Sequence, residues 1–135
     1  MAADYDGDGK TDIGIFRPAT GQWSVLVSST NYMTGLNFSW GTAADTPVPG
    51  DYDGDGKTDL GIFHPATGLW DVLLSSTDYA TSLTLAWGTA TGIPFHGDYD
   101  GDGKTDPGIF NPSTGRWEIL FSGANYTTSM TSITQ

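Results

Sequence analysis

Hydrophobic and polar residues alternate along short stretches of this chain, a pattern that predicts β-strands. In residues 23–27, the side chains of Trp23, Val25 and Val27 fall on one face of an extended chain. Residues 70–74 and 117–121 repeat this pattern, with a polar residue directly after the tryptophan. We expect both faces of each sheet to be covered, because one leucine per stretch lies on the opposite face: Leu26, Leu73 and Leu120. No ten-residue stretch has the 3.6-residue period of a helix, so the predicted helix content is near zero.

Turn residues divide these stretches into short strands. Pro18 and Gly21 surround a tight turn before Trp23, as in a β-hairpin. One strand enters an Asp-rich segment, a second leaves it, a third begins at tryptophan and a fourth ends at Trp-Gly, which gives four strands per unit. Each second strand contains a glycine that we expect to allow close approach by a neighbouring sheet, namely Gly14, Gly61 and Gly108.

The whole pattern recurs every 47 residues. The segment Asp-Tyr-Asp-Gly-Asp-Gly-Lys-Thr-Asp begins at Asp4, Asp51 and Asp98, and the first two units are identical at 31 of 47 positions. A four-stranded antiparallel sheet that recurs at this period is typical of a β-propeller blade. We therefore predict an all-β chain of three blades, with repeats at residues 1–50, 51–97 and 98–135, the last truncated at its end. Because propellers close with about 4–8 blades, we expect homo-oligomerisation to complete the ring, most simply as a dimer with six blades.

The Asp-rich segment has the spacing of a calcium-binding loop. Ca²⁺ takes about six to eight oxygen ligands at roughly 2.3–2.6 Å. Side chains at positions 1, 3, 5 and 9 and the backbone carbonyl at position 7 supply such oxygens, and glycine at position 6 allows the positive φ that the loop needs. About three ions per chain are expected. The predicted ligands, with each lysine contributing its carbonyl, are Asp4, Asp6, Asp8, Lys10, Asp12, Asp51, Asp53, Asp55, Lys57, Asp59, Asp98, Asp100, Asp102, Lys104 and Asp106.

These loops differ from an EF-hand, because position 12 holds isoleucine (Ile15, Ile62 and Ile109) where that motif needs a bidentate glutamate. The alternative interpretation is a solvated acidic turn, in which Asp-Gly favours a tight bend. Three identical loops with all five ligand positions filled favour the metal site.

Charge and composition narrow the function classes. The chain has 16 acidic and 5 basic residues and a net charge of -11, but 13% aromatic residues argue against disorder. Five basic residues are too few for a nucleic-acid partner. No apolar run has the length of a membrane span, and we expect no membrane insertion. Cysteine is absent and no signal peptide precedes Asp4, so a secreted or cell-surface origin is inferred from the calcium chemistry alone.

These motifs together resemble the FG-GAP/VCBS repeat family of integrin-like β-propellers. The resemblance covers essentially the whole chain and rests on the Asp-rich loop, on Gly-Ile-Phe-x-Pro-x-Thr-Gly-x-Trp, and on Trp-Gly followed by Pro-x-x-Gly before the next loop. It implies radial four-stranded blades with one calcium in the loop between the first two strands. It also implies extracellular adhesion or recognition, and some relatives look like lectins with sugar sites between blades. The chain differs from the pattern of this family in the number of its blades, which is three.

Eight side chains are candidates for contact with a glycan. A tryptophan that recurs in each unit is either a platform for the face of a sugar or a core residue between sheets. The tryptophans of the two Trp-Gly pairs are expected to be more exposed than the tryptophan that recurs in each unit. The variable residue x of Phe-x-Pro lies either at a ligand-facing position or on plain surface. In that order, the candidates are Trp23, Trp70 and Trp117; Trp40 and Trp87; and Arg17, His64 and Asn111.

Enzyme chemistry has little support. The two histidines both lie in the second unit without a triad motif, and the loop carboxylates have a better use on calcium. We therefore predict a calcium-binding propeller recognition module that is lectin-like and is not an enzyme. The alternative is a structural or protein-adhesion module, either a natural fragment or an engineered self-assembling repeat, with calcium as its only small ligand.

Overall fold

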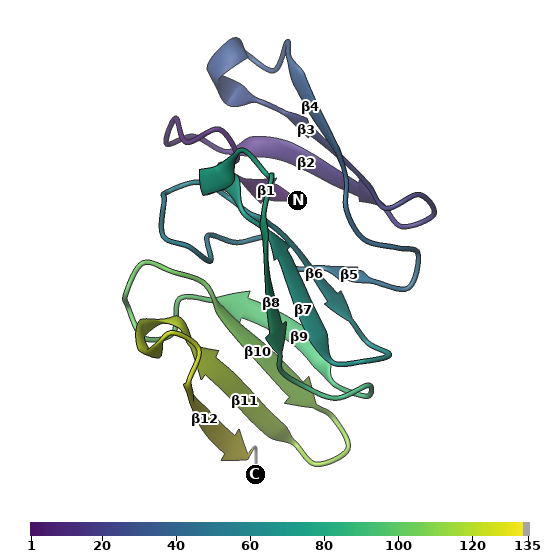
Figure 1. Ribbon diagram of the computed structural model, residues 1–135, viewed down its shortest axis with the longest axis vertical. Helices are drawn as coiled ribbons and strands as arrows, with labels where there is room; N and C mark the ends of the chain where they lie inside the picture. The colour runs from purple at the N-terminus through teal and green to yellow at the C-terminus, as the bar shows by residue number, and fades with distance from the viewer. Residues whose placement is uncertain (134–135) are drawn as a thin grey trace.

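Three four-stranded antiparallel sheets contain all the strands of residues 1–133, the part of the chain that the computed structural model describes. The sheets follow one another along the long axis of the molecule, from the N-terminus to the C-terminus (Figure 1). The all-β prediction and the four strands per repeat are confirmed. The first sheet comprises β1 (Ala2–Ala3), β2 (Asp12–Arg17), β3 (Gln22–Leu26) and β4 (Gly35–Ser39); the second, β5 (Thr46–Pro47), β6 (Leu60–His64), β7 (Leu69–Leu73) and β8 (Ser82–Ala86); the third, β9 (Ile93–Gly97), β10 (Asp106–Asn111), β11 (Arg116–Phe121) and β12 (Thr128–Ile133).

The tight turn predicted after Phe16 joins β2 and β3. Arg17 pairs with Gln22 at the end of this hairpin, and the Thr20 amide donates a 3.1 Å hydrogen bond to the Arg17 carbonyl. Gly21 has a φ of 65°, a conformation that glycine adopts without steric cost. The same hairpin recurs between β6 and β7 and between β10 and β11.

A single 3₁₀ turn follows the third strand of each sheet: η1 (Ser28–Thr30), η2 (Ser75–Thr77) and η3 (Ser122–Ala124). Each turn ends at a residue in the left-handed region, with φ between 54° and 55° at Asn31, Asp78 and Asn125. Residues 1–133 contain no α-helix, as predicted, and no helix among them has the length and hydrophobicity to cross a membrane.

The hydrophobic core lies between successive sheets. Trp23 and Val25 of the first sheet pack with Ile62 of the second. Trp70 of the second sheet packs with Ile109 of the third. The expectation that both faces of every sheet are covered is therefore correct for the second sheet and wrong for the first and the third, each of which has one uncovered face. Leu26, on the outer face of the first sheet, is 43% exposed, whereas its equivalent Leu120 is 7% exposed.

The close approach expected at the strand glycines comes from within the same sheet. A Cβ atom at Gly61 would meet the Val48 carbonyl, on the segment that leads from β5 of the same sheet into the second loop. At Gly108 it would meet the ring of Phe95, which lies on the neighbouring strand β9. The expectation of a neighbouring sheet was wrong because the first strand of each sheet already lies against this position.

Candidate metal centre

The three Asp-rich loops join the first two strands of each sheet. They lie along one edge of the molecule, on the left in Figure 1, close to the 3₁₀ turns. The hairpin turns lie at the opposite edge. The repeat therefore brings three copies of one acidic loop to the same side of the chain.

Hydrogen bonds from backbone amides to carboxylates hold each loop in a tightly wound conformation. In the first loop, the Asp4 carboxylate accepts bonds from the amides of Gly7 (2.6 Å) and Gly9 (2.9 Å). Asp8 accepts a 2.8 Å bond from the Lys10 amide. Gly7 and Gly9 both have a φ of 83°, and such a conformation strongly favours glycine. The second and third loops repeat these bonds at the equivalent residues.

Three carboxylates converge in each loop. One oxygen from each member of the set lies within 4.8 Å of the others, and the sets are Asp4, Asp6 and Asp8; Asp51, Asp53 and Asp59; and Asp98, Asp100 and Asp106. Two carboxylates at 4 Å repel by about 4 kcal/mol at an effective dielectric constant of ~20. A hard divalent cation would remove this repulsion, and carboxylate oxygens are the ligands that Ca²⁺ prefers.

Asp12, at the end of the first loop, fastens the loop to the 3₁₀ turn. It is fully buried, and one carboxylate oxygen accepts hydrogen bonds from the amides of Tyr5 (2.7 Å) and Asp6 (3.2 Å). The other oxygen accepts a 2.7 Å bond from the Ser28 amide. Asp59 and Asp106 make corresponding bonds and also belong to the clusters described above.

Three of the predicted carboxylate ligands, Asp12, Asp55 and Asp102, lie outside these three-residue sets. The other predicted ligands are the backbone carbonyls of Lys10, Lys57 and Lys104, whose contact with a cation stays a prediction. Each of the three carboxylates accepts hydrogen bonds from its own loop or from the 3₁₀ turn. Their direct contact with a cation stays a prediction.

Serines that were not among the predicted site residues donate hydrogen bonds to the carboxylates. The Ser28 hydroxyl donates a 3.0 Å bond to Asp8, and the Ser29 hydroxyl donates a 2.6 Å bond to Asp6. Ser75 and Ser122 make the bond equivalent to that of Ser28. The signal was present in the sequence, because a serine recurs 16 residues after the last aspartate of every loop.

Burial and hydrogen bonding move the pKa values of the loop carboxyls in opposite directions. Burial raises the pKa of Asp59 to about 6, against hydrogen bonds from Ser75 and Tyr52 that lower it. Burial also raises the pKa of Asp51 above its ordinary value. The hydrogen bond from the Ser29 hydroxyl lowers the pKa of Asp6. The second site thus combines two carboxyls whose charged forms are destabilised by their surroundings, which a bound cation would stabilise.

Successive loops are bonded to each other. The Thr58 amide of the second loop donates a 2.8 Å hydrogen bond to the Asp4 carbonyl of the first. The Tyr79 hydroxyl lies between both loops, 3.0 Å from the Thr58 carbonyl and 3.3 Å from the Tyr5 carbonyl. The third loop is bonded to the second in the same way, through Thr105 and Tyr126. Hydrogen bonds therefore connect each loop directly to the next.

The tryptophans considered as sugar platforms divide into two groups. Trp23 and Trp70 are fully buried, and their indole nitrogens donate to the carbonyls of Trp40 (2.9 Å) and Trp87 (2.7 Å). These two are core residues, because the neighbouring sheet covers the ring face that a sugar would need. Trp117, at the equivalent position of the third sheet, is 41% exposed.

Trp40 and His64 meet between the first and second sheets. They line a hollow of about 200 Å³ together with Asp71. The Trp40 indole donates a 3.2 Å hydrogen bond to the Asp71 carbonyl, and the His64 ring lies between two carboxylates, with Nδ1 2.5 Å from Asp45 and Nε2 2.9 Å from Asp71. Burial lowers the pKa of His64, but these two carboxylates outweigh it and raise the pKa above its ordinary value.

The other polar candidates do not join this hollow. Arg17 is exposed and donates a 3.1 Å bond to the Ser24 hydroxyl. The Asn111 side chain accepts bonds from the Ser113 amide and hydroxyl in its own hairpin turn. The Trp87 indole lies at the equivalent of Trp40, next to the third sheet.

Comparison with family models, with curated proteins and with solved structures gives no match for this chain.

Proposed function

We propose that the chain is a calcium-binding repeat module of the β-propeller type, with one ion in each Asp-rich loop. The observation that carries the proposal is the convergence of three carboxylates in every loop. The loop spacing and the resemblance to FG-GAP/VCBS repeats support calcium over a transition metal, because all the expected ligands are oxygens. The setting we propose is outside the cell, where calcium sites of modest affinity are filled.

In this proposal calcium stabilises the molecule. The cation offsets the repulsion among carboxylates that the fold holds close together, and the bonds between loops transmit the resulting order along the chain. Because a ligand that binds only the folded state stabilises it by mass action, calcium should raise the melting temperature and chelation should lower it.

Calorimetric titration of chelator-stripped protein with calcium tests the proposal. We expect about three ions per chain and the loss of one site in Asp53→Asn, since this change removes one charged oxygen from the second set. Asp78→Asn is the matched control. It removes the same charge outside the loops, at a position where the other two repeats have Asn31 and Asn125. Absence of calcium binding, or equal loss of binding in the control, would overturn the proposal.

A second candidate function is carbohydrate recognition in the hollow between the first two sheets. Its support is the meeting of the Trp40 indole with the polar groups of His64 and Asp71, which lie on adjacent sheets. A glycan array in calcium tests this function, with Asp71→Ser as the variant because the first repeat has Ser24 at that position. Binding that the variant abolishes supports a lectin, whereas no binding to any glycan favours a structural or adhesion module.

A further inference from the structure

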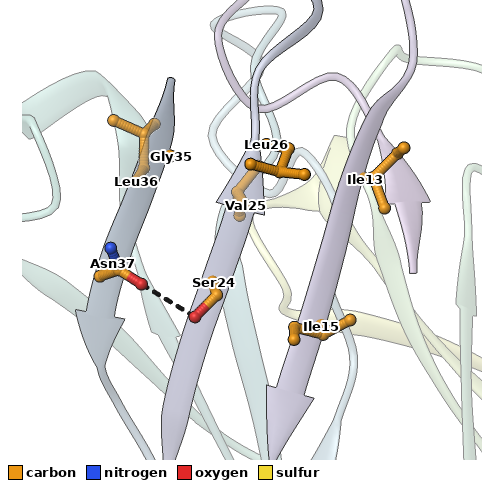
Figure 2. A pocket seen from close by; sticks show the side chains of 8 residues that line it. All are labelled: Ile13, Ile15, Ser24, Val25, Leu26, Gly35, Leu36 and Asn37. Atoms are coloured by element: carbon orange, nitrogen blue, oxygen red, sulfur yellow. Dashed lines mark hydrogen bonds between the residues drawn. The ribbon is translucent and has the colours of Figure 1, made fainter. Parts of the chain in front are cut away.

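The first sheet has an apolar face that neither of the other sheets exposes. Figure 2 shows Ile13 and Ile15 on β2 and Leu26 on β3, around a hollow of about 230 Å³. Ile15 is 46% exposed, whereas its equivalents Ile62 and Ile109 are 2% and 1% exposed. In the second and third sheets, this face lies against the preceding sheet. We refer to Ile13, Ile15, Leu26 and Tyr32 as the head face.

The third sheet has the opposite face uncovered. Tyr99 is 49% exposed and Met130 is 46% exposed. Their equivalents in the second sheet are Tyr52, which is 1% exposed, and Leu83, which is half-buried. We refer to Tyr99, Trp117 and Met130 as the tail face. The chain therefore has at its two ends the two halves of an interface that it forms twice internally.

The two internal interfaces use the same contacts. A threonine amide donates to a loop carbonyl of the preceding repeat, from Thr58 to Asp4 (2.8 Å) and from Thr105 to Asp51 (2.6 Å). The Tyr79 and Tyr126 hydroxyls donate to the carbonyls of Tyr5 (3.3 Å) and Tyr52 (2.9 Å).

A lysine side chain lies over a loop glycine of the preceding repeat in both interfaces. Atoms of Lys57 come within 3.0 Å of the Cβ position of Gly7, and atoms of Lys104 come within 3.0 Å of that of Gly54. At the third repeat, no atom of the described residues lies within 4 Å of the corresponding position on Gly101. Lys10, the equivalent lysine of the first repeat, belongs to the exposed first loop.

We propose that the head face of one copy of this chain binds the tail face of a second copy. The repeat sets the register: the Thr11 amide meets the Asp98 carbonyl, the Tyr32 hydroxyl meets the Tyr99 carbonyl, and Lys10 covers Gly101 of the other copy. Tyr32 is already placed for this contact, because its hydroxyl donates a 3.0 Å bond to the Thr11 carbonyl, as Tyr79 does to Thr58. The association is head-to-tail and so joins different surfaces. It does not depend on calcium occupying the loops.

A complementation experiment by light scattering tests this contact. Ile15→Asp blocks the head face, Met130→Asp blocks the tail face, and both residues are exposed enough for a single chain to tolerate the change. The unaltered chain should have the mass of two or more chains, and each variant alone should be a monomer. An equimolar mixture has one intact head and one intact tail, so it should form a dimer. Ala19→Asp adds the same charge in the exposed hairpin turn and should associate like the unaltered chain.

Three results would overturn the proposal. The first is an unaltered chain that stays monomeric at every concentration. The second is a mixture of the variants that stays monomeric although each variant keeps the circular dichroism of the unaltered chain. The third is association of the Met130→Asp variant by itself, which would indicate head-to-head contact.

Carbodiimide cross-linking of unaltered protein gives an independent measurement that needs no substitution. In a mixture of isotopically heavy and light chains, we expect Lys10 to join the third-loop carboxylates of another copy, by analogy with Lys57 beside the first loop. Cross-links from Lys10 that stay within one copy would contradict the proposed register.

Discussion

The second sheet and the two outer sheets are built from the same repeat but have different surroundings. Trp70 and Ile62, on opposite faces of the second sheet, are both buried. Trp117 has the position of Trp70 in the third sheet, and Ile15 has the position of Ile62 in the first, yet both are exposed. The burial of a residue in this repeat therefore depends on the sheet beside it. Equivalent substitutions should therefore differ in their cost to stability from one sheet to another.

The largest expected effect is at the isoleucine of the head face and its buried counterpart. Ile62→Ala should lower the free energy of unfolding by about 2–5 kcal/mol, because it leaves a cavity between two sheets. Ile15→Ala should cost about 0.5 kcal/mol or less, since the side chain is already partly in water. Urea unfolding, at a concentration where light scattering finds single chains, measures both.

The loss of unfolding free energy in Ile15→Ala rises with protein concentration if copies of the chain associate through this residue. Such a rise would mean that a second copy buries the head face. Equal costs for both substitutions in a dilute monomer would instead show that the outer sheet is covered by its own chain, against the exposure described above.

A smaller effect is expected at the tyrosine of the 3₁₀ turn. Tyr79→Phe removes a hydroxyl that contacts carbonyls in two repeats, and should lower the unfolding free energy by about 1 kcal/mol. Tyr32→Phe removes one exposed bond within the first repeat and should cost less. Thermal melting of the two variants in the same buffer provides the comparison, and a larger cost for Tyr32→Phe in the monomer would contradict it.

The smallest effect is expected at His64, which distinguishes the interface between the first two sheets from the interface between the last two. The folded-state pKa of His64 is raised, so its stabilising contribution is complete below the unfolded pKa of about 6.5 and is lost as pH rises through the folded value. The melting temperature of His64→Asn should therefore fall below that of the unaltered chain mainly at mildly acidic pH. The difference should shrink as pH increases.

The third repeat supplies the control for this histidine. Gly92 replaces Asp45 there and Asn111 replaces His64, so Asn111→His would have no aspartate at the first of the two flanking positions. Its effect on melting should depend less on pH than that of His64. Equal pH dependence in both variants would mean that the flanking carboxylates do not set the pKa of His64.

Local spacing in the sequence was enough to predict the strands, the hairpins and the acidic loops. The alternation around Trp23 and the turn at Gly21 involve residues close in sequence, and both are confirmed. The convergence of Asp4, Asp6 and Asp8 follows from positions two residues apart in a tightly wound loop. The period of 47 residues then gave three copies of the same sheet.

Only the tertiary structure decided what lies beside each copy. It buried Trp23 and Trp70 as core residues, brought Asp45 of one repeat to His64 of the next, and left Ile15 uncovered. It also brought the Ser28 amide to Asp12, whose carboxylate accepts a hydrogen bond from it. A repeat specifies the same local structure each time, but burial and long-range hydrogen bonds depend on neighbours that differ between the middle and the ends of the chain.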